Sequence, residues 1–177
     1  MEKVVLVNEQ NEVIGEADKA TVHSQQTPLH RAFSLFIFDN QRRLLLQQRA
    51  GCKKTWPLVW SNSCCGHPQL NESNIDAAKR RCQFELGITV DNIVEAAPYR
   101  YCFSHKGVME NEICPILVAF YDGPLDLNPQ EVQATRWVLW TDWLAQIRQN
   151  PTDFSPWCVE ESEILAALHG FELTIIP

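Results

Sequence analysis

One well-marked helix, predicted over residues 74–86, restricts the fold of this chain more than any other feature. Its apolar residues recur at i, i+3, i+7 and i+11, at Ile75, Ala78, Cys82 and Leu86. This spacing places them on one face of a helix. Asn74 stands where a helix cap is expected, and Gly87 can end the helix. The fold must therefore give this apolar face another layer to pack on.

The rest of the regular pattern is mostly β. Runs rich in β-branched and aromatic residues are predicted as strands at 4–8, 13–16, 32–38, 43–48, 93–103, 112–121 and 135–140. Further helices are predicted at 141–149 and about 156–169, the second entered through Ser155-Pro156. Strands alternating with few helices predict an α/β or α+β fold, an α/β/α sandwich around a mixed β-sheet. Without linker or repeat, residues 1–177 are predicted to form a single domain.

Charge and cysteine content exclude several functional classes. The net charge of −7 argues against nucleic acid as an electrostatic partner. No stretch approaches 18 apolar residues, and the first residues show no signal-peptide pattern, so no membrane association is predicted. Seven cysteines, an odd number spread irregularly, favour reduced thiols in a cytoplasmic protein over a disulfide framework.

The segment from Asn62 to Pro68 carries the most chemical information. It reads Asn-Ser-Cys-Cys-Gly-His-Pro and places the Cys65 thiol, a flexible glycine and the His67 imidazole together. A cysteine beside a histidine can transfer protons, bind a metal, or be a buried apolar thiol. If adjacent residues point apart, only one of Cys64 and Cys65 can face a substrate.

The spacing from Gly66 to Ile88 resembles the Nudix box, a loop–helix–loop in which helix carboxylates hold divalent metal against a diphosphate. Two glutamates of the family's pattern are replaced here by Arg81 and Phe84, and Glu85 is retained. Hydrolysis of a diphosphate needs carboxylates to hold the metals that activate water. The resemblance implies a Nudix-like fold whose hydrolytic groups are largely lost.

The whole chain resembles the type 1 isopentenyl-diphosphate delta-isomerases, a Nudix-fold family that shifts a C=C bond instead of cleaving the diphosphate. The resemblance is carried by six segments that lie between residues 19 and 157. They are His23-x6-His30, Arg49-x3-Lys53-Lys54-x-Trp56-Pro57, Trp60-x-Asn62-Ser63-x-Cys65-Gly66-His67-Pro68, Arg80-Arg81-Cys82-x2-Glu85-Leu86-Gly87, Glu110-Asn111-Glu112-x-Cys114-Pro115 and Phe154-Ser155-Pro156-Trp157. Together these motifs are highly specific.

The resemblance implies which residues handle protons. An unactivated alkene is a poor base, so its isomerisation needs a positioned acid, a dry pocket and a second proton-handling group on the opposite face. The family pattern implies Cys65 and Glu112 as this pair, with Tyr101 relaying a proton. Trp157 is implied as the stabiliser of a tertiary carbocation, because an indole face attracts a positive centre. Without the family, Trp157 would be taken for an ordinary core residue.

The family also implies one divalent metal, held by three imidazoles and two carboxylates: His23, His30, His67, Glu110 and Glu112. Such ligands suit Mn²⁺, Zn²⁺ or a similar ion, with Mg²⁺ a further candidate. A lone histidine is more often a hydrogen-bonded or surface group, but three of the five histidines fall on motif positions. Glu110 and Glu112 lie two residues apart, which on a strand places both side chains on one face.

A small-molecule diphosphate is the implied partner, and its charge needs cations. Lys19, Arg49, Lys53 and Arg81 match the family's binding positions, and Mg²⁺ with Glu85 is implied to bridge the phosphates. Arg81 and Glu85 are four residues apart, so a simple helix ion pair is an alternative. The other basic residues considered are interpreted as surface charges: Arg42, Arg43, Lys54 and Lys79.

Two other functional classes remain as alternatives. A Nudix-type diphosphate hydrolase would release phosphate or nucleotide, and a catalytically inactive binding module would bind ligand without turnover. The replaced box glutamates argue against the first, and the presence of Cys65, Glu112 and Trp157 argues against the second. The chain is expected to act as a monomer or homodimer.

Overall fold

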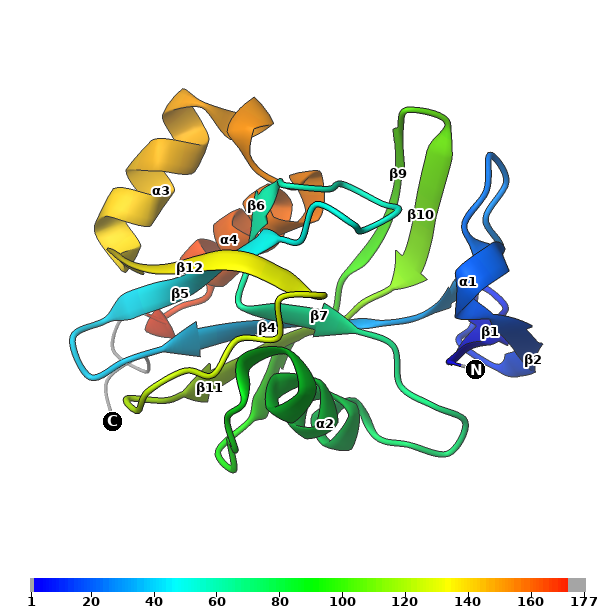
Figure 1. Ribbon diagram of the computed structural model, residues 1–177, viewed down its shortest axis with the longest axis horizontal. Helices are drawn as coiled ribbons and strands as arrows, with labels where there is room; N and C mark the ends of the chain where they lie inside the picture. Colours follow the sequence, from blue (N-terminus) through cyan, green and yellow to red (C-terminus); the bar gives the residue numbers. More distant parts are fainter. Residues whose placement is uncertain (1, 172–177) are drawn as a thin grey trace.

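The computed structural model describes residues 2–171 and contains two β-sheets with helices around them (Figure 1). The five-stranded sheet has the order β2-β1-β3-β10-β9, formed by β1 (Lys3–Val7), β2 (Val13–Asp18), β3 (His30–Arg31), β9 (Arg100–His105) and β10 (Val108–Ile113). The second sheet follows the order β12-β5-β4-β11-β8, formed by β4 (Phe33–Phe38), β5 (Arg43–Arg49), β8 (Val94–Ala97), β11 (Ile116–Phe120) and β12 (Val132–Leu139). The short strands β6 (Trp60–Ser61) and β7 (Cys64–Gly66) pair with β5 and β4.

Helices cover both faces of the larger sheet. Helix α2 (Asn74–Leu86) lies on one face, while α3 (Trp140–Gln149) and α4 (Pro156–Ala167) lie on the other, with α1 (Lys19–Val22) beside the smaller sheet (Figure 1). Strands β4 and β11 run parallel, and their other neighbours in the sheet are antiparallel. This arrangement confirms the predicted α+β sandwich around a mixed sheet. No helix among the described residues is long and apolar enough to span a membrane.

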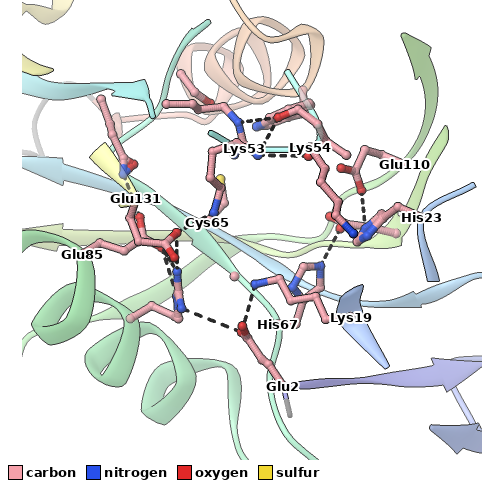
Figure 2. A pocket seen from close by; sticks show the side chains of 18 of the residues that line it. Glu2, Lys19, His23, Lys53, Lys54, Cys65, His67, Glu85, Glu110 and Glu131 are labelled. Atoms are coloured by element: carbon pink, nitrogen blue, oxygen red, sulfur yellow. Dashed lines mark hydrogen bonds and ion pairs between the residues drawn. The ribbon is translucent and has the colours of Figure 1, made fainter. Parts of the chain in front are cut away.

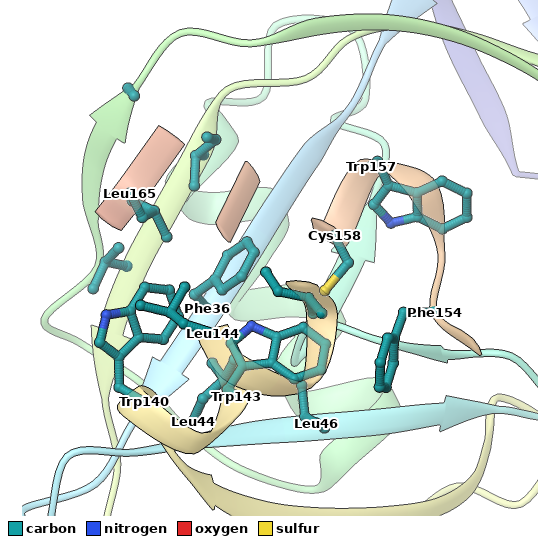
Figure 3. Packing of buried hydrophobic residues seen from close by; sticks show 14 of the residues in the cluster. Phe36, Leu44, Leu46, Trp140, Trp143, Leu144, Phe154, Trp157, Cys158 and Leu165 are labelled. Atoms are coloured by element: carbon teal, nitrogen blue, oxygen red, sulfur yellow. The ribbon is translucent and has the colours of Figure 1, made fainter. Parts of the chain in front are cut away.

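Strand β4 divides the core into two halves, because successive side chains point to opposite faces of a sheet. Phe36 and Phe38 pack with α3 and α4, in a cluster that includes Trp143 (Figure 3). Leu35 and Ile37 pack on the other side against the apolar face of α2. The same alternation separates the adjacent thiols of β7, since Cys64 lies in the α2 cluster and Cys65 packs against the α3–α4 cluster.

Helix α2 occupies the predicted residues 74–86, but its cap is not Asn74. Ser73 is the N-cap, and its side-chain oxygen accepts a hydrogen bond from the backbone N–H of Asp76. A serine hydroxyl in this position satisfies one of the free N–H groups of the first turn. At the other end Gly87 has φ +66° and its N–H bonds to the carbonyl of Cys82, as predicted for the end of this helix.

Two of the predicted strands are split in the structure. The run at 93–103 forms β8 and β9 with Pro98 between them, and the run at 112–121 forms parts of β10 and β11 with Pro115 between them. Proline interrupts a ladder because it has no N–H to donate. The split matters for the site, because β9 and β10 leave the larger sheet and join the smaller one.

Gly66 allows β7 to lie close to α2. A β-carbon at this position would stand 2.8 Å from Cγ of Arg81 and 3.1 Å from the ring of Phe33. Only glycine therefore fits without displacing the Arg81 side chain. This close approach places Cys65 and His67 beside the helix that carries Arg81 and Glu85.

Candidate active site

A pocket of about 360 Å³ opens where the two sheets meet, between β10, the β7–α2 segment and the start of α4. Twelve of the thirteen predicted site residues line it: Lys19, His23, Arg49, Lys53, Cys65, His67, Arg81, Glu85, Tyr101, Glu110, Glu112 and Trp157. The thirteenth, His30, is fully buried behind Glu112. In Figure 2, Glu85 and Glu131 lie on one side of Cys65, and His23 and Glu110 on the other.

Three imidazoles converge on Glu112. One ligand atom from each of His23, His30, His67 and Glu112 lies within 4.8 Å of the other three. Oε1 of Glu112 is 3.0 Å from Nε2 of His67 and 3.2 Å from Nε2 of His30. Glu110 joins at the edge, with Oε2 2.9 Å from Nε2 of His23. Strand pairing builds the cluster, because Glu112 is the register partner of His30.

Several of these buried atoms have no hydrogen-bond partner: Nε2 of His23, Nε2 of His30, Nδ1 of His67 and Oε2 of Glu110. Nδ1 of His30 lies 2.9 Å from the carbonyl of Pro28, to which its N–H can donate, and this tautomer leaves Nε2 as a lone pair. A buried polar atom without a hydrogen-bond partner is costly unless another group, such as a bound ion, satisfies it. The residues therefore fit a divalent metal ion.

The charges of the cluster depend on one another. Burial alone would raise the pKa of Glu112, but the adjacent imidazoles of His30 and His67 hold it well below its usual range. Burial lowers the pKa of His67 to about 3, although Glu112 opposes this shift. His67 is thus a neutral imidazole facing a carboxylate, the protonation state in which both groups ligate a metal.

Cys65 points into the pocket from the middle of its wall. Its sulfur lies 3.2 Å from Oδ1 of Asn62 and 3.5 Å from Oγ of Ser34. Burial raises the pKa of Cys65 to about 12. The thiol is therefore protonated near neutral pH. Of the two adjacent cysteines, Cys65 lines the cavity and Cys64 does not.

Aromatic residues form the apolar wall. Tyr101 donates a hydrogen bond from its hydroxyl to Oε2 of Glu112, its register partner on β10. The rings of Tyr101 and Trp157 stack with centroids 5.8 Å apart, and Trp56 meets Trp157 edge-on at 5.1 Å. Trp157 is both a core residue, only 2% exposed, and a lining residue of the pocket.

Three of the five basic residues that line the pocket are paired with carboxylates. Arg81 contacts Glu85 through Nε at 3.0 Å and Glu131 through Nη2 at 3.0 Å. Lys53 is paired with the same Glu131, and Lys19 with Glu2 at 2.9 Å. The predicted i, i+4 pair of Arg81 and Glu85 is therefore present, and it lies in the pocket instead of on the surface.

Sequence reasoning missed a set of lining residues: Glu2, Gln47, Ser61, Asn62, Gln130 and Glu131. Gln47 donates a hydrogen bond of 2.7 Å to Oε2 of Glu85. Lys54, interpreted above as a surface charge, is exposed but lines the pocket and donates to the backbone carbonyl of Ala20. Asn62 and Lys54 lie inside the quoted motifs, which was the available signal, whereas Glu2 and Glu131 stand outside every motif.

Comparison with known proteins identifies the family. A family model of the NUDIX domain matches residues 28–158. The isopentenyl-diphosphate Delta-isomerase of Saccharopolyspora erythraea is 46% identical over 170 residues, which cover 95% of this chain and 88% of that protein. The chain belongs to the isopentenyl-diphosphate Delta-isomerase family. Another member, from Brevibacterium linens, is 45% identical over 177 residues, and the match covers 97% of each of the two chains.

Solved structures confirm the Nudix fold of this isomerase-family chain. A crystal structure of a Deinococcus radiodurans protein has a TM-score of 0.65 at 22% identity, covering 84% of this chain and 90% of that one. The MutT protein of Methanosarcina mazei has a TM-score of 0.63 at 17% identity, covering 83% and 95%. At these identities the likeness concerns the fold alone.

Proposed function

We propose that the enzyme converts isopentenyl diphosphate to dimethylallyl diphosphate in this pocket, with Cys65 and Glu112 as its two proton-handling groups. The observation that carries the proposal is the placement of both groups on the walls of one cavity, in a chain of the isopentenyl-diphosphate Delta-isomerase family. One group adds a proton to the terminal carbon of the double bond. A tertiary carbocation forms, and the other group removes a proton from the carbon on its far side.

The aromatic wall suits this intermediate. The Trp157 face offers negative electrostatic potential to a cation and carries no nucleophile that would trap it. Such a contact is worth about 2 kcal/mol or more when water is excluded. Tyr101, hydrogen-bonded to Glu112, can pass a proton to or from that carboxylate. The aromatic side chains of this wall also exclude water, which would otherwise add to the carbocation.

The diphosphate is proposed to bind at the end of the pocket lined by Lys19, Arg49, Lys53 and Arg81. Mg²⁺ accompanies the diphosphate, with Glu85 as its protein partner. A second divalent ion, Mn²⁺, Zn²⁺ or Mg²⁺, is assigned to the site formed by His23, His30, His67, Glu110 and Glu112. When bound, it supplies positive charge that fixes the orientation of the Glu112 carboxylate. The orphaned imidazole nitrogens support this assignment.

Isomerisation and hydrolysis are distinguished by following the reaction in D₂O by NMR. We expect deuterium to enter at the shifted positions of the product, because protons are exchanged with groups of the pocket, and no phosphate to be released. Release of phosphate would instead support the hydrolase alternative. A product free of deuterium, formed at the normal rate, would contradict the two-group proton mechanism.

Removal of the metal should abolish turnover and lower the melting temperature. The ligands come from the end of α1, β3, the end of β7 and β10, so a bound ion joins four separate segments. A ligand at about 100 times its Kd stabilises the folded state by about 2.7 kcal/mol. The measurements are melting temperature, metal content and activity after treatment with a chelator. Mn²⁺, Zn²⁺ and Mg²⁺ are then added back singly, and the ion that restores all three readouts identifies the metal. Full activity in metal-free protein would refute the assignment.

A further inference from the structure

Glu161 on α4 is a buried carboxyl group without a cation. Its exposed fraction is 0%, and its Oε2 atom has no hydrogen-bond partner. The other buried glutamates among the described residues, Glu85, Glu110 and Glu112, each face an arginine or a histidine. An isolated buried carboxylate is very costly, so such a group takes up a proton instead. In agreement, burial raises the pKa of Glu161 well above its usual range.

This carboxyl group lies directly behind the proposed proton-handling thiol. Ser34 connects the two, because its hydroxyl lies beside the Glu161 carboxyl and 3.5 Å from the sulfur of Cys65. Ser34 and Cys65 are register partners on β4 and β7, so their contact is set by strand pairing. Cys114 contacts both Ser34 and Glu161. Its sulfur lies 3.4 Å from Oγ of Ser34 and 3.9 Å from Oε1 of Glu161.

The amide of Asn62 sets the direction of the hydrogen bonds. Nδ2 of Asn62 donates to the carbonyls of Leu35 and Cys64 at 3.1 Å and 3.3 Å, so its Oδ1 faces Cys65 and accepts the thiol proton. The Cys65 sulfur is then left as an acceptor, toward which Ser34 can turn its single hydroxyl proton.

Ser34 can donate its hydroxyl proton to the Cys65 sulfur only if the carboxyl group of Glu161 is neutral. An ionised Glu161 would draw the Ser34 proton to itself and leave the sulfur without a donor. A protonated Glu161 has no such pull and can itself donate to the Ser34 oxygen, which would complete a one-way chain from Glu161 through Ser34 and Cys65 to Asn62. Two hydrogen bonds, one on each side, then hold the sulfur in a single orientation.

We propose that Glu161 is a positioning residue for catalysis, which acts through Ser34 to hold the Cys65 thiol toward the substrate. The inference rests on the proposed role of Cys65. Because Glu161 does not line the pocket, it is expected to affect the chemical step and not the binding of the diphosphate. Misplacement of a reacting group by about 1 Å can cost about 100-fold in rate.

The test compares three variants by kcat, KM and melting temperature. Glu161→Gln keeps a neutral N–H donor for Ser34, and we expect wild-type kcat. Glu161→Leu introduces an apolar side chain of similar volume that cannot donate a hydrogen bond to Ser34. We expect its kcat to fall about 10- to 100-fold with KM unchanged. Ser34→Ala should lower kcat by a similar factor. The double variant Ser34→Ala/Glu161→Leu should be no slower than the slower single one, because both substitutions break the same chain.

Glu163→Leu is the matched control, since Glu163 is on the same helix but pairs with Arg148 at the surface. It should keep wild-type kcat. Wild-type kcat in Glu161→Leu, an equal loss in Glu161→Gln, or multiplying losses in the double variant would each overturn the proposal. If Glu161→Leu does not fold, Glu161→Met takes its place with the same expectation, because methionine is more flexible.

Cys65→Ala is assayed in parallel. If Cys65→Ala is inactive while Glu161→Leu is not impaired, only the role proposed for Glu161 is refuted. If Cys65→Ala is active, the role proposed for Cys65 itself is refuted.

Discussion

Replacing Cys65 with alanine should lower kcat by about 10⁴-fold, the upper end of what a positioned acid or base contributes. The substitution removes the Cys65 thiol from the pocket wall. Among the described lining residues the other thiol is that of Cys52, which is exposed and whose sulfur contacts the carbonyl of Gln130. The diphosphate-binding cations are unchanged, so KM should stay close to its wild-type value. Product formation by NMR measures the loss, and isothermal titration with substrate measures binding.

Cys64→Ala is the matched control for this experiment. Cys64 is adjacent in sequence, but it is fully buried against α2 on the other face of the sheet. Its replacement leaves a small cavity and should lower the stability by about 1 kcal/mol without changing kcat. An active Cys65→Ala together with an inactive Cys64→Ala would show that the catalytic thiol had been assigned to the wrong residue.

Glu112→Gln should be almost as damaging, because Glu112 both handles a proton and completes the imidazole cluster. An amide cannot accept the proton, so we expect kcat to fall by about 10³- to 10⁴-fold even at saturating metal. Metal content should also fall, since Oε1 of Glu112 is the atom shared by His30 and His67. Both quantities are measured on protein purified with and without added metal.

Glu110→Gln separates these two roles. Glu110 contacts only the His23 edge of the cluster and is two residues from Glu112 on the same strand. We expect this variant to bind metal more weakly but to recover most of its kcat when metal is added in excess. If Glu112→Gln recovered in the same way, Glu112 would be a ligand only, and the proton role assigned to it would be wrong.

The sequence predicted the three longer helices and most strands because their patterns are local, whereas the one-turn helix α1 was not predicted. The apolar spacing and Gly87 located α2. Strand β7 was not predicted, so the opposite directions of Cys64 and Cys65 were only a condition of the assignment of Cys65. The cap was wrong by one residue, since Ser73 and Asn74 are both good caps and only backbone geometry separates them. The splits at Pro98 and Pro115 follow from the missing N–H, which strand propensity alone does not weigh.

Twelve of the thirteen residues named from motif positions line one cavity, because the motifs lie on strands and loops that meet there. Ser34 and Glu161 were not predicted, because their importance comes from strand register and helix packing between distant segments. A glutamate on the surface and a fully buried one look the same in a sequence. Glu131 was missed for a similar reason, as its pairing with Lys53 and Arg81 joins residues 50 or more positions apart.

The ion pairs of the pocket have a consequence for how its ligands bind. The lining side chains include five basic residues, Lys19, Arg49, Lys53, Lys54 and Arg81, and five acidic residues, Glu2, Glu85, Glu110, Glu112 and Glu131. These ten charges cancel, so the cavity wall has no surplus attraction for an anion. A divalent ion among the imidazoles gives it that surplus, so metal and diphosphate should bind with positive cooperativity. By thermodynamic reciprocity, each then raises the affinity of the other by the same factor.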